Sequence, residues 1–125
     1  MKYLCLIYSD EKGLDARPET EWGGRVSECL AAHEELSKSG HVIASEALQP
    51  VHTATTVRVR NGRLSTTDGP FAETKEQLGG FYLIEARDLN EAIQVAARIP
   101  AARWGSVEVR PIWEPRPDAP RAGRL

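Results

Sequence analysis

Asp68 is the carboxylate whose position best suits proton transfer. Asp68 comes directly before Gly69-Pro70, at the end of a segment rich in threonine, and side chains at strand ends commonly face a pocket. A carboxyl group held in a dry pocket has its pKa raised toward neutrality, as general acid–base catalysis requires. A carboxylate at such a position also caps turns by accepting backbone N–H groups. The residue type fits both roles.

His33 is the candidate partner of Asp68, because imidazole titrates near neutral pH and can relay a proton. It falls on the apolar side of an expected helix, which points it toward the interior rather than toward solvent. A lone histidine on such a side is often a core residue satisfied by one hydrogen bond. His33 is therefore a catalytic candidate with a structural alternative.

Three other residues are candidates for substrate binding. Phe71 would supply an aromatic wall, which is also what a core phenylalanine does. Glu108 and Arg110 are two residues apart in the last expected strand and therefore lie on the same face of it. There they would bind an anionic substrate, order a pocket or form a structural ion pair.

The three histidines do not predict a metal site. His33, His41 and His52 lie on different expected elements and lack the close spacing of metal ligands. We therefore expect no metal and no other cofactor.

The composition predicts one globular domain that does not bind nucleic acid. The chain has 125 residues, of which 41% are hydrophobic and 27% charged, with a formal net charge of −2. Binding to phosphates needs clustered Lys and Arg, whereas the arginines here are spread along the chain. Cys5 and Cys29 lie in apolar patterns typical of buried thiols in a reducing compartment, with a disulfide between them left open. No segment approaches the ~20 apolar residues of a membrane span, so we expect a cytoplasmic protein without a membrane partner.

Periodicity predicts the first elements. Residues 2–8 are apolar on both alternating faces, which is typical of a central strand covered on both sides. Residues 9–19 are polar and predict a loop. Apolar residues then recur at three- and four-residue steps from residue 21, as in an amphipathic helix that ends at Gly40, with Thr20 as its N-cap.

A β-hairpin is the clearest local signal. Residues 55–60 and 63–67 are rich in β-formers and flank Asn61-Gly62, a pair that tolerates the positive φ angles of a tight hairpin turn. The second run leads directly to Asp68. Gly69 precedes a proline and is therefore expected to be extended.

The remaining pattern predicts a second helix and further strands. Asp88 to Glu91 fits a capping box for a helix through Ile99, where Pro100 stops it. The further expected strands cover residues 41–48, 80–86 and 106–113.

Without the hairpin, the order is β-α-β-β-α-β, the split βαβ pattern of ferredoxin-like domains. Two helices then cover one face of an antiparallel sheet. The apolar residues on the other face of 2–8 and 80–86 need a cover, and a second copy of the chain is the simplest one. We predict an α+β homodimer in which two sheets pack face to face.

Several segments together resemble a known family. Asp68-Gly69-Pro70-Phe71 is followed by Glu-Thr-Lys-Glu and Gly-Gly, and the chain also carries Met1-Lys2-Tyr3-Leu4, Glu46-Ala47-Leu48 and Val107-Glu108-Val109-Arg110-Pro111. Over about the first 113 residues this pattern resembles the YCII-related (DGPF-domain) family. The resemblance implies a ferredoxin-like α+β fold with an extra hairpin that dimerises into an α+β barrel. Residues 114–125 lie outside it as a flexible or partner-docked tail.

The resemblance implies no settled function. Some relatives of the wider family are proposed or known to act with a His–Asp pair, including a dechlorinating member of an aromatic degradation pathway. Their histidine stands in an Arg-x-x-His context, whereas here Arg25 lies eight positions before His33. Many DGPF members are encoded beside extracytoplasmic-function sigma factors, which implies a regulatory role instead.

Two main hypotheses follow. The first is a small cofactor-free lyase, isomerase or dehalogenase in which Asp68 moves a proton, shared with His33. The second is a non-catalytic dimeric module that binds a small molecule or a protein and is linked to sigma-factor regulation. A cofactor-free monooxygenase is a third reading, which rests on fold analogy alone.

Overall fold

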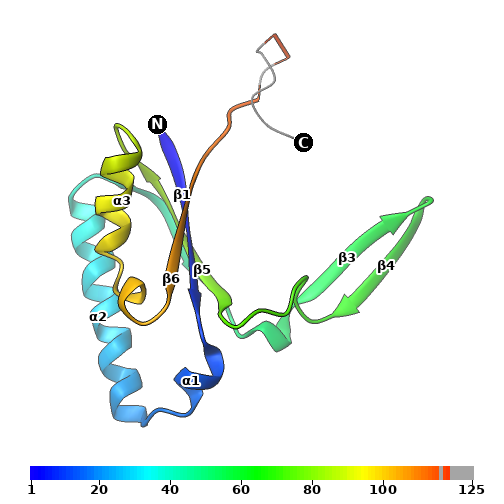
Figure 1. Ribbon diagram of the computed structural model, residues 1–125, viewed down its shortest axis with the longest axis horizontal. Helices are drawn as coiled ribbons and strands as arrows, with labels where there is room; N and C mark the ends of the chain where they lie inside the picture. Colours follow the sequence, from blue (N-terminus) through cyan, green and yellow to red (C-terminus); the bar gives the residue numbers. More distant parts are fainter. Residues whose placement is uncertain (116, 119–125) are drawn as a thin grey trace.

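Four antiparallel strands form the sheet at the centre of the protein (Figure 1). A computed structural model describes residues 1–115, 117 and 118. The strands follow one another across the sheet in the order β2–β5–β1–β6. They are β1 (Lys2–Ser9), β2 (Val42–Ala47), β5 (Gln77–Glu85) and β6 (Ser106–Pro111). The predicted α+β class is confirmed, and the strand expected to be central, β1, pairs with a neighbour on each side.

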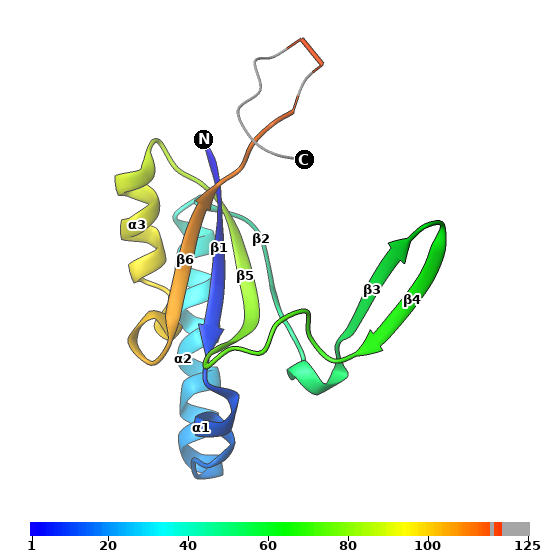
Figure 2. The ribbon, with the colours of Figure 1, turned by 45° about the vertical axis from the view of Figure 1, so that its right-hand side comes forward.

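Two helices, α2 (Glu19–Lys38) and α3 (Leu89–Ala97), lie on the same face of this sheet (Figures 1 and 2). Two expectations about the start of α2 were wrong. Its N-cap is Pro18 rather than Thr20, which lies inside the first turn. The polar segment before it is not all loop, because Asp10 accepts the backbone N–H of Lys12 and caps a short helix, α1 (Glu11–Asp15).

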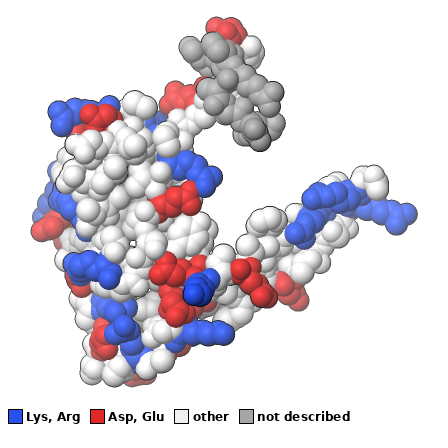
Figure 3. Space-filling model, viewed as in Figure 1, with Lys and Arg blue, Asp and Glu red and all other residues white. Residues whose placement is uncertain are grey.

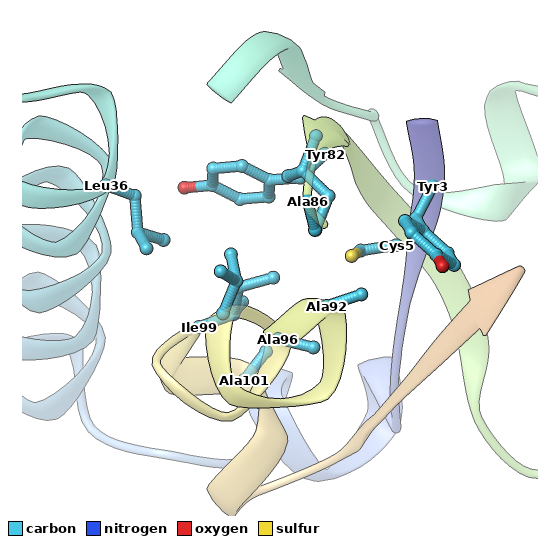
Figure 4. Packing of buried hydrophobic residues seen from close by; sticks show 11 residues of the cluster. Tyr3, Cys5, Leu36, Tyr82, Ala86, Ala92, Ala96, Ile99 and Ala101 are labelled. Atoms are coloured by element: carbon cyan, nitrogen blue, oxygen red, sulfur yellow. The ribbon is translucent and has the colours of Figure 1, made fainter. Parts of the chain in front are cut away.

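The core lies between the two helices and the sheet (Figure 4). Alternate residues of β1 and β5 point into it and meet the small residues of α3, which let helix and sheet approach closely. Its buried members are Tyr3, Cys5, Leu36, Tyr82, Ile84, Ala86, Ala92, Val95, Ala96, Ile99 and Ala101. Cys5 and Cys29 are both free thiols, so the disulfide that the sequence left open does not form. Burial raises the pKa of the Cys5 thiol to about 11.

Helix α3 starts as its sequence predicts, with half of a capping box. The Asp88 side chain accepts the backbone N–H of Glu91 at 2.9 Å. The Glu91 carboxylate does not return the bond; it pairs instead with Arg87 and with His41. The helix ends at Ala97, and Pro100 opens the 3-10 turn η2 (Pro100–Arg103).

The predicted hairpin is confirmed and stands away from the sheet (Figures 1 and 2). It consists of β3 (Thr55–Arg60) and β4 (Arg63–Asp68), joined by Asn61 at φ 50° and Gly62 at φ 73°. The 3-10 turn η1 (Val51–Thr53) leads into it. Figure 3 shows basic side chains gathered at its free end, which carries Arg58, Arg60 and Arg63.

One face of the hairpin is apolar and exposed. Val59 pairs with Leu64 across the strands, and Val57 lies two residues away on the same face. These three side chains are 59%, 70% and 58% exposed, respectively. Asp68 pairs with Thr55 and so belongs to this same face.

On the face of the sheet opposite the helices, the two central strands β1 and β5 are also apolar. Leu4 pairs with Leu83 and Leu6 with Phe81, and these residues alternate with those that point into the core. No helix among residues 1–115 lies over them (Figure 2). Residues 116 and 119–125 of the predicted tail lie outside the described residues. Within the described part, no helix is long and apolar enough to cross a membrane.

Candidate functional site

A cavity lies at the base of the hairpin, where β3–β4 joins the end of the sheet. We call it the hairpin-base cavity; its volume is about 450 Å³. Its walls come from the end of β1, the β2–β3 connection, the β4–β5 connection and the start of β5. The apolar lining residues are Tyr8, Leu48, Pro50, Val51, Ala54, Pro70, Phe71, Ala72 and Leu78, and the polar ones are Gln49, Thr53, Thr74 and Gln77.

The turn after Asp68 directs Pro70 and Phe71 into this wall. The Gly69 N–H donates to the Ala54 carbonyl at 2.8 Å, and the Thr56 hydroxyl donates to the Gly69 carbonyl at 2.9 Å. Gly69 has φ +108°, so the expectation of ordinary extended backbone was wrong. Only glycine adopts this conformation without strain.

Long-range hydrogen bonds fix the other walls. The Glu11 carboxylate accepts the Val51 N–H, at 3.1 Å to Oε1, and the Glu11 N–H donates to Gln77 Oε1 at 2.9 Å. Gln77 Nε2 in turn donates to the Thr74 carbonyl at 2.6 Å. The sequence analysis did not single out Glu11 or Gln77. No local pattern marks them, because their partners lie 40 and 66 residues away along the chain.

Asp68 lies beside the cavity but does not line it. Its side chain is exposed at the end of β4. Within the described part of the chain, its carboxylate takes part in none of the hydrogen bonds that hold the turn; Ala54 and Thr56 hold it instead. The carboxylate is therefore free to meet a ligand or a partner on the apolar face of the hairpin.

His33 lies elsewhere, on α2, at a second cavity between this helix and the sheet. Its ring centroid is 5.8 Å from that of Tyr82. The side chain is exposed rather than interior. Asp68 is not among the residues that line this cavity. The structure therefore does not bring the two predicted catalytic residues together within one chain.

The predicted binding residues are also separated. Phe71 forms part of the hairpin-base cavity while being 81% exposed, with the Arg58 guanidinium 5.8 Å from its ring centroid. Glu108 and Arg110 form an ion pair with each other on β6. Their neighbours across β1 are Leu6 and Leu4, on the open face of the sheet.

His41 has local partners. Its Nδ1 lies 2.7 Å from the Ser39 hydroxyl and its Nε2 3.3 Å from Glu91 Oε1. The hydrogen bond from Arg87 lowers the pKa of the Glu91 carboxyl. Among residues 1–115, 117 and 118, no three His, Cys, Asp or Glu side chains gather in a way that would hold a metal ion.

Comparison with known proteins gives the family. The YCII-related domain matches this chain over residues 1–116. The chain belongs to the YCII-related family. An uncharacterised protein of Rhizobium meliloti (strain 1021) is 38% identical over 114 residues, which cover 90% of this chain and 92% of that protein. The family resemblance inferred from the sequence is confirmed.

The chemistry of the cavity in this YCII-related protein is that of a binding site for an uncharged molecule. None of its described lining residues carries a formal charge. The side chains of Gln49, Thr53 and Thr74 offer hydrogen bonds among apolar walls. Such a combination binds a compact apolar body and fixes its orientation through a few polar contacts.

Proposed function

We propose that this YCII-related protein is a homodimeric binding protein for a compact, mainly apolar ligand held in the hairpin-base cavity. The observation that carries the proposal is the cavity itself, whose volume of about 450 Å³ falls within the ~300–1,000 Å³ of typical ligand pockets. Hydrogen bonds of Glu11 and Gln77 connect its walls in the ligand-free protein. A preformed site of this kind reduces the ordering cost of binding.

The finer fold assignment belongs to the same proposal. We assign a ferredoxin-like βαββαβ topology, supported by the order β2–β5–β1–β6 and by antiparallel pairing throughout the sheet. Two such sheets would face each other in a dimeric α+β barrel. The apolar face with Leu4 and Leu83, which no described helix covers, supports this packing.

A second copy is the partner that fits the exposed apolar face of the hairpin. The hairpin reaches away from its own sheet (Figure 1), and its Val57, Val59 and Leu64 side chains would be buried by that copy. A dimer that binds a ligand beside this interface can act as a sensor of the ligand without catalysing a reaction on it. Such a sensor fits the regulatory role that the family's gene neighbours imply.

Replacing Ala54 by phenylalanine should block the cavity. Ala54 has extended backbone, with φ −71° and ψ 153°, and lines the wall, so a larger side chain is tolerated by the chain but occupies the ligand's space. With indole as a neutral probe, we expect affinity to fall by at least about tenfold. The measurement is an amide NMR titration that follows Leu48, Gly69 and Leu78.

Ala31→Phe is the matched control, because Ala31 is exposed on α2 and lines neither cavity. This variant should bind indole as the wild type does. Equal binding by Ala54→Phe and the wild type, or a wild type whose cavity residues do not respond to indole, would contradict the proposed site.

A cofactor-free proton-transfer enzyme is the second candidate function. It is favoured by the Asp68 carboxylate, which is not committed to the turn and faces the side of the hairpin that a second copy would cover. Covered in that way, the carboxyl would lose water, and its pKa would rise toward the working pH.

Asp68→Asn separates the two candidates. If Asp68 moves a proton, the variant should lose about 10²–10⁴-fold in turnover. Its melting temperature should not change, because the side chain is exposed and does not hold the turn. The assay follows proton exchange or elimination in small cyclic compounds by NMR. Turnover that survives in Asp68→Asn excludes this role.

A further inference from the structure

A second cavity, separate from the hairpin-base cavity, lies between α2 and the sheet edge formed by β2 and β5. We call it the helix-side cavity; its volume is about 370 Å³, and it shares no lining residue with the first. Most of its lining residues are apolar, and they come from β1, α2, β5 and the start of η2. These include Ile7, Leu30, Ile99 and Pro100.

Four polar side chains line this apolar space. Cys29 and His33 lie one helical turn apart on α2. Ser45 on β2 and Tyr82 on β5 are direct partners across the sheet. The Tyr82 ring extends from β5 toward α2 with its hydroxyl leading (Figure 4).

Across the described residues, no hydrogen bond joins the side chains of Cys29, His33, Ser45 or Tyr82 to another protein group, and none of their nitrogen or oxygen atoms is sealed from the cavity. A polar group in apolar surroundings is stabilised by a hydrogen bond. The Tyr82 side chain is only 8% exposed, so a ligand in the cavity is placed to supply this bond to its hydroxyl, whereas His33 also reaches solvent.

Two of these groups, the Cys29 thiol and the Tyr82 hydroxyl, are hydrogen-bond donors. Burial raises the pKa of the Cys29 thiol, an effect that the nearby Arg25 partly opposes. Burial also raises the pKa of the Tyr82 hydroxyl, and Cys29 adds to that effect. Both groups therefore keep their protons at neutral pH and act as donors.

We propose that the helix-side cavity is a second binding site, which takes a neutral, ring-sized molecule carrying a hydroxyl or carbonyl group. The apolar wall receives the ring. Tyr82 and Ser45 on the sheet, together with His33 on the helix, bond its oxygen. This site is independent of the hairpin-base cavity.

Phenol is the probe that tests this site in the full chain. An amide NMR titration should show saturable shifts at Ser45, Gly80 and Ala101, which line the cavity. Tyr82→Phe keeps the ring and removes the hydroxyl, so phenol affinity should fall about fivefold. Toluene has the same ring without oxygen, and its affinity should be equal in Tyr82→Phe and the wild type.

Tyr3→Phe is the matched control, because Tyr3 is a core tyrosine that lines neither cavity. It should bind phenol as the wild type does. His33→Leu provides a second variant if Tyr82→Phe fails to give a folded amide spectrum, and it should weaken phenol to a similar extent. The proposal is overturned if phenol leaves these residues unshifted, or if both variants bind phenol as tightly as the wild type.

Discussion

The double variant Val57→Glu/Val59→Glu should be a monomer under conditions where the wild type is a dimer. Both valines lie on the apolar face of the hairpin and are more than half exposed in the single chain. Their burial by a second copy would contribute about 1.5 kcal/mol each or more. Replacing them by charges should therefore raise the dimer dissociation constant at least about a hundredfold. Light scattering after size-exclusion chromatography measures the mass directly.

The opposite face of the same hairpin offers a matched control. Ser65→Glu/Thr67→Glu introduces the same two charges, also two residues apart on one strand. These residues alternate with Leu64 and so point away from the apolar face. The control should remain a dimer. If the valine variant is also a dimer, or if the wild type is a monomer, the hairpin is not the contact between copies.

Among the glycines that the structure describes, Gly105→Ala should cause the largest loss of stability of any alanine substitution. A Cβ at Gly105 would overlap the carbonyl oxygen of Tyr8 and lie 3.1 Å from the Cα of Ser9. Both obstacles are backbone, and the next residue, Ser106, pairs with Tyr8 in the sheet. The contact between β1 and β6 must open to make room. We expect a loss of about 3 kcal/mol in the free energy of unfolding.

Urea unfolding measures this loss as a lower midpoint with an unchanged slope. Gly79→Ala is the control, since Gly79 has no positive φ and a Cβ there would meet nothing within 4 Å. That variant should unfold within about 0.5 kcal/mol of the wild type. A Gly105→Ala protein as stable as Gly79→Ala would contradict the packing of β1 against β6 described above.

The fold was largely predictable from sequence where its signals are local. Apolar residues on both faces identified β1 as central, and Asn61-Gly62 identified the hairpin through its backbone requirement. The helix α1 was missed because one side-chain cap, Asp10, creates it within a polar segment. The conformation of Gly69 was missed because the carbonyl of Ala54 and the hydroxyl of Thr56, both distant in sequence, select it.

The candidate site was less predictable, because its geometry depends on contacts between distant segments. Asp68 and His33 were paired on chemical type alone. The projecting hairpin places Asp68 away from the cavity that His33 lines. Phe71 was predicted as an aromatic wall and does line the hairpin-base cavity. Glu11, which fixes the opposite wall, has no signature in sequence, since an acidic residue shortly after a strand is ordinary.

The most direct test of the proposed function is to locate the bound probe. In a complex of the wild-type protein with indole, NMR cross-relaxation identifies the methyl groups that lie within about 5 Å of the indole ring protons. A ligand in the hairpin-base cavity predicts cross-peaks from indole to the methyl groups of Leu48, Val51 and Leu78. Cross-peaks only to Leu30 and Ile99 in the helix-side cavity, or to no methyl group of the chain, would contradict it.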